Sequence, residues 1–212
     1  MRIGILGSGL MGGKLGTIFA RAGHEVVFSY SRDRKKLERL ARDAGPGARA
    51  GTPRDAAADA ELLLTAVHWN RFDDVLKQVG DISGRILVTC SLPMDDANTE
   101  LVVAHTSSGA EELAKRARGA SVVSAFGSIP SEVLFDVFAA RGTGTPPSML
   151  YCGDDADAKA LVAGLIRDVG FDPTDVGPLE SSRYIEPFTM LIAKLAYETD
   201  GGPEVAYRFV RY

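Results

Sequence analysis

Short apolar segments alternate with amphipathic stretches along most of the chain. Five segments are almost continuously apolar, which is typical of strands buried on both faces of a parallel sheet: residues 1–6, 25–30, 61–67, 85–90 and 122–125. Residues 48–50 predict a further short strand. Between these strands, apolar side chains recur at helical spacing, as in the set Met11, Leu15, Ile18 and Phe19. The pattern predicts an α/β fold built on a Rossmann-type, doubly wound parallel sheet.

Polar residues at the predicted helix starts have the side chains that cap helices. Asp33 and Thr52 precede two of these helices, and Pro53 occupies the first helical position of the second. Asn70 precedes a helix that carries apolar residues from position 72 to position 79. Ser108 with Glu111 matches a capping box, in which each side chain bonds the other residue's backbone N–H group.

The last third of the chain carries shorter elements. They are a helix over 131–140, a loop over 141–147, a strand over 149–152, a helix that ends at Gly170, a possible strand over 172–176 and a helix over 181–197. We therefore divide the chain into a Rossmann domain, residues 1–130, and a small C-terminal α+β appendage, residues 131–212, for substrate binding or dimerisation. The apolar side of the last helix fits either the core or a subunit contact.

The first strand runs directly into a glycine-rich turn. It reads Gly7-Ser8-Gly9-Leu10-Met11-Gly12, a G-x-G-x-x-G pattern between a strand and an amphipathic helix. In such turns the first glycine permits the bend, the second lets a pyrophosphate approach the backbone and the third lets helix and strand pack closely. The pattern predicts a dinucleotide site, although an ordinary glycine-rich turn has the same composition.

The end of the second strand indicates which dinucleotide is bound. An Asp or Glu there would bond the ribose 2′-hydroxyl of NAD, whereas this chain has Ser31 and Arg32, with Lys36 about one helical turn on. A hydroxyl and two cations suit a 2′-phosphate. Asp33 could serve as an NAD-type acid, but it comes late and suits a helix cap. We favour NADP(H) over NAD(H), so residues 1–130 are predicted as an NADP-binding domain.

Three residues lie at or just beyond the carboxyl ends of two further predicted strands, residues 61–67 and 85–90. Ligands of doubly wound sheets bind outside the carboxyl ends of the strands, which places Val67, His68 and Leu92 beside the cofactor. His68 could orient a substrate or exchange a proton. It could equally bond only a loop backbone, because the sequence shows no carboxylate to orient it.

Composition narrows the class of protein. The 212 residues carry a formal net charge of −4, which argues against nucleic acid or an anionic membrane as the main partner. No apolar run approaches the roughly 18 residues that span a bilayer, and we expect no secretory signal before the first strand. The two cysteines and three histidines show no metal-ligand spacing. Buried free thiols suit a reducing compartment, so we predict a cytoplasmic protein.

Further sequence markers follow the glycine turn along the whole chain: Ser31-Arg32 with Lys36, residues 66–69, residues 124–130, residues 152–155, Gly177-Pro178-Leu179, Ser182-Arg183, Glu186 and the tail 204–210. With these markers the chain resembles the deazaflavin (coenzyme F420) dependent NADP oxidoreductases and their bacterial relatives. It is also similar to the NADPH-binding domain of the STEAP metalloreductases and, more distantly, to the N-terminal part of pyrroline-5-carboxylate reductases.

The resemblance implies hydride transfer between NADP(H) and a deazaflavin, coenzyme F420, in a homodimer. By matching position, Ser8, Ser31, Arg32 and Lys36 would hold the 2′-phosphate, and Val67, Leu92 and Ala125 would line the nicotinamide side. His68 stands where proline is common, and Gly127-Ser128 replaces a more polar pair. The small-molecule acceptor therefore stays open: an NADPH-dependent flavin, ferric or quinone reductase and a non-catalytic NADP(H)-binding redox sensor are the alternatives.

Overall fold

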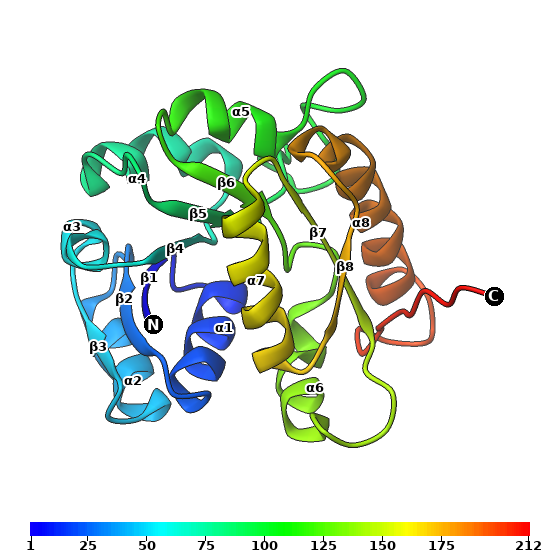
Figure 1. Ribbon diagram of the computed structural model, residues 1–212, viewed down its shortest axis with the longest axis horizontal. Helices are drawn as coiled ribbons and strands as arrows, with labels where there is room; N and C mark the ends of the chain where they lie inside the picture. Colours follow the sequence, from blue (N-terminus) through cyan, green and yellow to red (C-terminus); the bar gives the residue numbers. More distant parts are fainter.

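The computed structural model describes residues 1–212, and its eight strands form one sheet (Figure 1). The strand order is β3-β2-β1-β4-β5-β6-β7-β8. The strands are β1 (Arg2–Leu6), β2 (Glu25–Ser29), β3 (Ala48–Ala50), β4 (Leu62–Thr65), β5 (Ile86–Thr89), β6 (Ser121–Ser124), β7 (Ser148–Gly153) and β8 (Asp172–Asp175). The α-helices are α1 (Leu10–Arg21), α2 (Arg34–Ala44), α3 (Pro53–Ala58), α4 (Phe72–Val79), α5 (Gly109–Arg116), α6 (Leu134–Ala140), α7 (Ala156–Val169) and α8 (Ser182–Tyr197).

The sheet confirms the predicted Rossmann-type, doubly wound fold. β1 pairs in parallel with β2 on one side and with β4 on the other, so the chain changes direction across the sheet between β1 and β4. β7 pairs antiparallel with β6, and β8 runs parallel to β7. The C-terminal part thus extends the sheet of the first part, and the division at residue 130 stays a prediction. No helix combines the length and apolar character needed to cross a membrane.

Alternate residues of the central strands face two different cores. Leu62 and Leu64 pack into a core that also holds Ile18 of α1, while Leu63 packs into a second core with Phe72 of α4. α1, α2, α6 and α7 contribute to the first core, and α3, α4 and α5 to the second (Figure 1). Burial on both faces explains why these strands are apolar without alternation. α8 covers the adjoining face of β7, where Ile185 packs with Leu150.

Side chains cap four of the eight α-helices. Asp33 accepts the backbone N–H of Lys35 at the start of α2, and Thr52 forms a complete capping box with Asp55 at α3. Ser108 caps α5 and Asp155 caps α7.

Three helix starts differ from the prediction. Asn70 does not cap α4; it lies in a 3₁₀ turn, Trp69–Arg71, and donates to Asp96 at 2.8 Å, so a contact between loops replaces the expected local one. The helix predicted over 131–140 begins as a 3₁₀ turn, Ser131–Val133, before α6. The capping box predicted at Ser108 is half formed. Ser108 accepts the backbone N–H of Glu111, but the Glu111 carboxylate binds Arg183 instead of the backbone N–H of Ser108.

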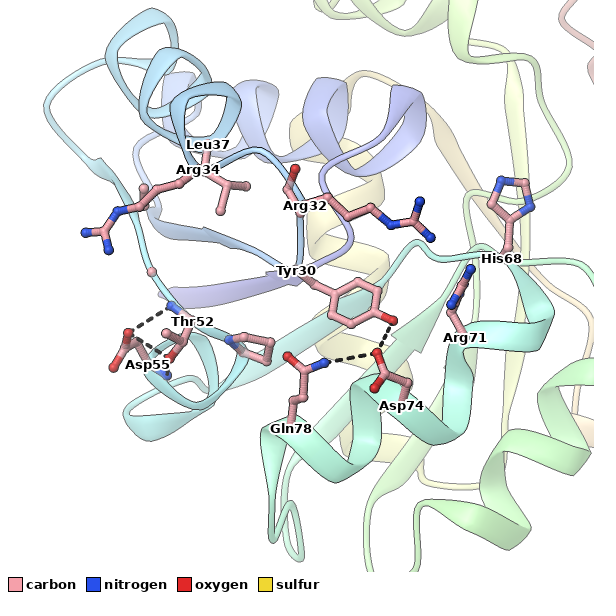
Figure 2. A pocket seen from close by; sticks show the side chains of 14 residues that line it. Tyr30, Arg32, Arg34, Leu37, Thr52, Asp55, His68, Arg71, Asp74 and Gln78 are labelled. Carbon is pink, nitrogen blue, oxygen red and sulfur yellow. Dashed lines mark hydrogen bonds between the residues drawn. The ribbon is translucent and has the colours of Figure 1, made fainter.

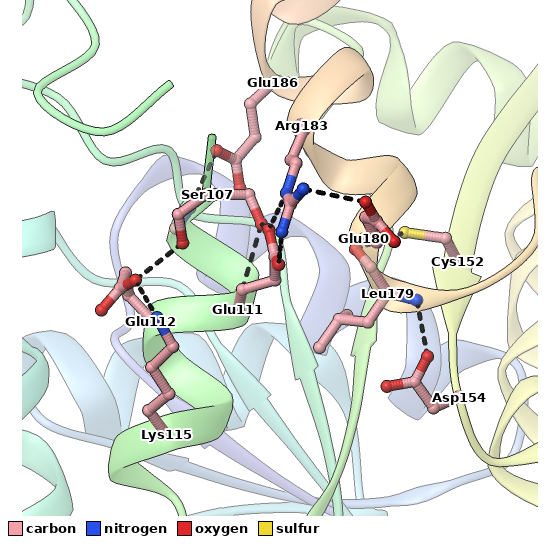
Figure 3. Close-up of polar contacts among 12 residues, drawn as sticks. Ser107, Glu111, Glu112, Lys115, Cys152, Asp154, Leu179, Glu180, Arg183 and Glu186 are labelled. Atoms are coloured by element: carbon pink, nitrogen blue, oxygen red, sulfur yellow. Dashed lines mark hydrogen bonds and ion pairs between the residues drawn. The ribbon is translucent and has the colours of Figure 1, made fainter. Parts of the chain in front are cut away.

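Buried and ion-paired carboxylates join α8 to the start of α5 (Figure 3). Glu186 is 3 % exposed and accepts the backbone N–H groups of Gly109 and Ala110 at 2.9 and 3.1 Å. The Arg183 guanidinium donates to both carboxylate oxygens of Glu111, at 2.7 and 2.9 Å. These contacts give a structural reason for two of the C-terminal markers: they fix α8 against the start of α5 in the N-terminal part of the chain.

The Glu186 carboxyl makes the stability of the fold depend on pH. Burial raises its pKa from 4.5 to about 7, against the two backbone N–H bonds that lower it. A raised folded-state pKa gives stability that is full below pH 4.5 and is lost as pH rises through about 7. We expect Glu186→Gln to remove this dependence, which at 1.36 kcal/mol per pKa unit reaches about 3 kcal/mol.

Urea unfolding between pH 4.5 and 8 measures the effect, with Glu198→Gln at the exposed end of α8 as the matched control. An unchanged pH profile in Glu186→Gln would contradict the expectation.

Candidate cofactor-binding site

A cleft opens where the chain changes direction, between the carboxyl ends of β1 and β4. Its volume of about 540 Å³ lies within the usual range for small-molecule sites. Ten of the thirteen residues predicted for the cofactor line this cleft: Gly7, Ser8, Gly9, Leu10, Met11, Ser31, Lys36, Val67, His68 and Leu92. The cleft therefore lies where doubly wound sheets bind their ligands, outside the carboxyl ends of the strands at the change of direction.

The three glycines of the turn meet three different surroundings. A Cβ atom on Gly12 would lie 1.9 Å from the carbonyl oxygen of Gly7, and one on Gly7 would lie 2.4 Å from that of Ala66. Gly7 also has φ +104°, which disfavours any L side chain. A Cβ on Gly9 would meet no atom within 4 Å. Gly7 and Gly12 are therefore required by packing, whereas Gly9 leaves space for a ligand.

The N-terminus of α1 has no side-chain cap. Gly9 occupies the capping position, and the first turn carries no acidic residue, unlike those of α3, α5 and α7. The first N–H groups of a helix have no partner within the helix and attract anions. An uncapped helix start that faces open space beside Gly9 fits a pyrophosphate.

The two serines predicted to bind phosphate differ in what they can donate. The Ser8 hydroxyl is buried and donates to the carbonyl of Ser29 at 3.0 Å, so its hydrogen holds the turn to β2. The Ser31 hydroxyl accepts the backbone N–H of Asp33 at 3.1 Å and keeps its own hydrogen free. Of the two, Ser31 has the hydroxyl that can donate to a phosphate.

A second cavity, of about 760 Å³, continues the cleft beyond the end of β2. Tyr30, Ser31, His68 and Arg71 line both spaces. Arg32 lines only this second cavity and forms no ion pair, whereas Lys36 lines the first. The two cations predicted for the 2′-phosphate therefore lie in two adjoining cavities that share four lining residues.

Two predicted residues lie outside both hollows. Gly12 packs against the Gly7 backbone, as the third glycine of the pattern should. Ala125 is 2 % exposed and belongs to the core, and Gly127 and Ile129 of the same loop line the cleft in its place.

Other residues of the hollow were missed by the sequence reasoning. Cys90, Met94 and Asn98 line the cleft through the segment after β5, and Arg71 and Tyr30 line its junction with the second cavity. In the sequence, only their positions after predicted strands pointed to them. They are far from the glycine turn in the chain, so the sequence does not show that they line the same cleft.

Burial affects two ionisable groups of the hollow. The phenol of Tyr30 donates to Asp74 at 2.5 Å, and its pKa is raised to about 12 by burial and by this carboxylate (Figure 2). Burial also raises the pKa of the Cys90 thiol to about 12. Both groups are therefore neutral at physiological pH, and Cys90 is not a thiolate nucleophile.

Sequence comparison finds a matching family and a curated relative. Residues 2–93 match the model of the family described as NADP oxidoreductase, coenzyme F420-dependent. Metalloreductase STEAP3 from Rattus norvegicus is 30 % identical over 185 residues, which are 87 % of this chain and 36 % of STEAP3. The chain thus spans about a third of the length of this curated relative.

Structure comparison finds the same fold in solved proteins. A proposed F420-dependent NADP reductase from Arthrobacter sp. FB24 superposes with a TM-score of 0.87 and 26 % identity, over 100 % of both chains. A reductive aminase from Aspergillus terreus in complex with NADPH has a TM-score of 0.66 and 21 % identity, over 92 % of this chain and 61 % of its own. At that identity the aminase shows the fold alone.

The fold and the glycine turn define a dinucleotide-binding protein of the Rossmann class. Within this class the chain is similar to NADP-dependent oxidoreductases, and its residues 2–93 match the model of the coenzyme F420-dependent family. The predicted resemblance to the coenzyme F420-dependent oxidoreductases and to the STEAP metalloreductases is confirmed by these matches.

The different surroundings of Gly9 and Gly12 predict opposite effects of the same substitution. Gly9→Ala should keep the melting temperature of the wild type but lose NADPH affinity, because the methyl group enters the space left for phosphate. Gly12→Ala should lose about 3 kcal/mol or more of stability, because its methyl group collides with backbone.

Thermal unfolding and calorimetric titration with NADPH separate the two effects. A Gly9→Ala variant that binds NADPH like the wild type would exclude this turn as the phosphate site.

Proposed function

We propose that the protein binds NADP(H) and transfers a hydride between its nicotinamide and a ring acceptor, for which coenzyme F420 is the first candidate. The observation that carries the proposal is the uncapped start of α1 at the cleft, together with the free hydroxyl hydrogen of Ser31 beside it and the unpaired Arg32 in the adjoining cavity. The family match over residues 2–93 supports both the cofactor and the acceptor.

The chain's own residues would bind and orient the two reactants. Ser31, Arg32 and Lys36 would hold the 2′-phosphate, and Val67 with Leu92 would face the nicotinamide. When bound, NADPH supplies the hydride. The protein then needs to hold two rings at about 3–3.5 Å, without a nucleophile of its own. The neutral Cys90 thiol and the neutral Tyr30 phenol are compatible with this role.

A second candidate is an NADPH-dependent ferric or flavin reductase. The similarity to a metalloreductase over 87 % of this chain favours it. The nucleotide half would serve the same purpose, and only the acceptor would differ.

One absorbance experiment distinguishes the candidates. The protein is mixed with NADPH and, separately, with F420, FMN, a quinone and a ferric chelate, and NADPH oxidation is followed. Oxidation with F420 supports the first candidate, and oxidation with FMN or ferric chelate only supports the second. Tight NADPH binding without oxidation of any acceptor would indicate a redox sensor and would overturn the enzymatic proposal.

Arg32 should decide between the two cofactors. We expect Arg32→Ala to weaken NADPH binding by about 1.5–3 kcal/mol, the usual contribution of a hydrogen bond to a charged group. NADH lacks the 2′-phosphate, so its affinity should hardly change. Titration of both cofactors by fluorescence measures this, and equal losses for the two would refute the 2′-phosphate assignment.

His68 should not be essential for chemistry. It is exposed, and no carboxylate bonds its ring. We expect His68→Ala to keep turnover within about tenfold of the wild type, because acid–base catalysis would cost about 10²–10⁴-fold. Steady-state kinetics with the active acceptor measures this. A hundredfold loss with both ligands still bound would assign His68 an acid–base role.

We also propose that the protein forms a homodimer through α8. Tyr184, Leu191 and Leu195 lie on its outward side and are 75 %, 54 % and 44 % exposed. Their spacing of seven and four residues forms one apolar stripe along the helix. Apolar stripes of this kind are typical of subunit contacts.

A further inference from the structure

Arg71 lies where the two hollows of the cofactor site meet. It is the last residue of the 3₁₀ turn that follows β4, and it lines the cleft, the second cavity and a smaller neighbouring hollow. The turn is fixed from the far side, because Asn70 donates to Asp96 in the segment after β5 at 2.8 Å. The backbone that carries Arg71 is therefore held in place before a ligand binds.

The side chain of Arg71 forms no hydrogen bond or ion pair within the chain. The acids of the second cavity have other partners: Asp74 accepts from Tyr30 and Gln78, and Asp55 accepts from Thr52. Arg32 is likewise unpaired. Figure 2 shows the guanidinium ends of Arg32 and Arg71 on the same side of Tyr30, and both charges act on its phenol.

Two unpaired guanidinium groups at one hollow repel each other unless an anion lies between them. They come from the loops after β2 and β4, the strands on either side of β1. A ligand that follows the glycine turn toward β2 passes between these loops. A dianionic group such as a ribose phosphate, bound between these loops, would have one arginine on each side.

We propose that Arg71 is a second arginine of the 2′-phosphate site, opposite Arg32, and thus a specificity-determining residue for NADP(H) over NAD(H). The inference rests on the proposed function, which assigns the first side of this site to Ser31, Arg32 and Lys36. It adds a contact from the β4 side that the family resemblance does not assign. Planar guanidinium groups suit a phosphate because each can donate two parallel hydrogen bonds.

Arg34 provides a matched control. It lines the same cavity, but its side chain points to the other side in Figure 2 and pairs with Glu38 at 3.2 Å. Arg34→Ala removes the same charge from the same hollow without removing the proposed contact. The comparison separates a direct contact from a general loss of positive potential.

The experiment is calorimetric titration of wild type, Arg71→Ala and Arg34→Ala with NADPH and NADH, and with the fragments 2′,5′-ADP and 5′-AMP. We expect Arg71→Ala to weaken NADPH and 2′,5′-ADP by about tenfold to a hundredfold. NADH and 5′-AMP should change less than about threefold, and Arg34→Ala should resemble the wild type for all four ligands. Thermal unfolding checks that each variant is folded.

Each other outcome has a distinct meaning. Equal losses for NADPH and NADH in Arg71→Ala would overturn the inference and indicate contact with adenine or ribose. Unchanged NADPH affinity in that variant would also overturn it while leaving the proposed function intact. A wild type that binds neither NADPH nor 2′,5′-ADP would refute the proposed function itself.

Discussion

The close approach of backbone to backbone at the start of α1 is the constraint on which the site depends. Gly12 lies so near the carbonyl of Gly7 that no side chain fits, and this contact seats α1 against the end of β1. The helix start is thereby aimed at the space beside Gly9. If α1 were moved outward to admit a methyl group, its unpaired N–H groups would leave the cleft. Packing in the core and anion binding at the surface thus have the same origin.

Local charge in this protein opposes the charge of the whole chain. The formal net charge is −4, yet Arg32, Lys36 and Arg71 stand unpaired along two adjoining cavities. Asp55 and Asp74 lie in the same region, but hydrogen-bond donors hold both carboxylates in fixed positions. An acidic protein can therefore attract a polyanionic cofactor, because the electrostatic potential at a concave surface depends mainly on the unpaired charged side chains nearest to it.

Much of the fold and of the glycine turn could be predicted, because their signals are local. Apolar runs mark β1, β4 and β5. Asp33 caps α2 and Thr52 caps α3, as expected. Contacts between distant segments could not be predicted in this way. Asn70 has the side chain of a cap, but a partner 26 residues away takes it. In the sequence, Arg71 is likewise indistinguishable from an ordinary surface cation. Only the pairing of β4 with β1 shows that it lies at the cleft.

The C-terminal markers show the same limit. Residue identity alone could not show that Glu186 would accept two N–H groups of a helix 76 and 77 residues earlier. The antiparallel pairing of β7 was also hidden, because apolar strands read alike in either direction. Both the Glu186 contact and the direction of β7 depend on which surface of the sheet is left uncovered after the first six strands have paired.

The two edges of the sheet determine how copies of this protein can meet. β3 has three residues, which offer little backbone for another strand to pair with. At the other edge, Asp172 and Val176 donate inward to carbonyls before and within β7, so the nitrogen of Pro173 faces outward and has no hydrogen to offer. Such edges resist the addition of a foreign strand. Growth of the sheet from chain to chain is thereby disfavoured at both edges.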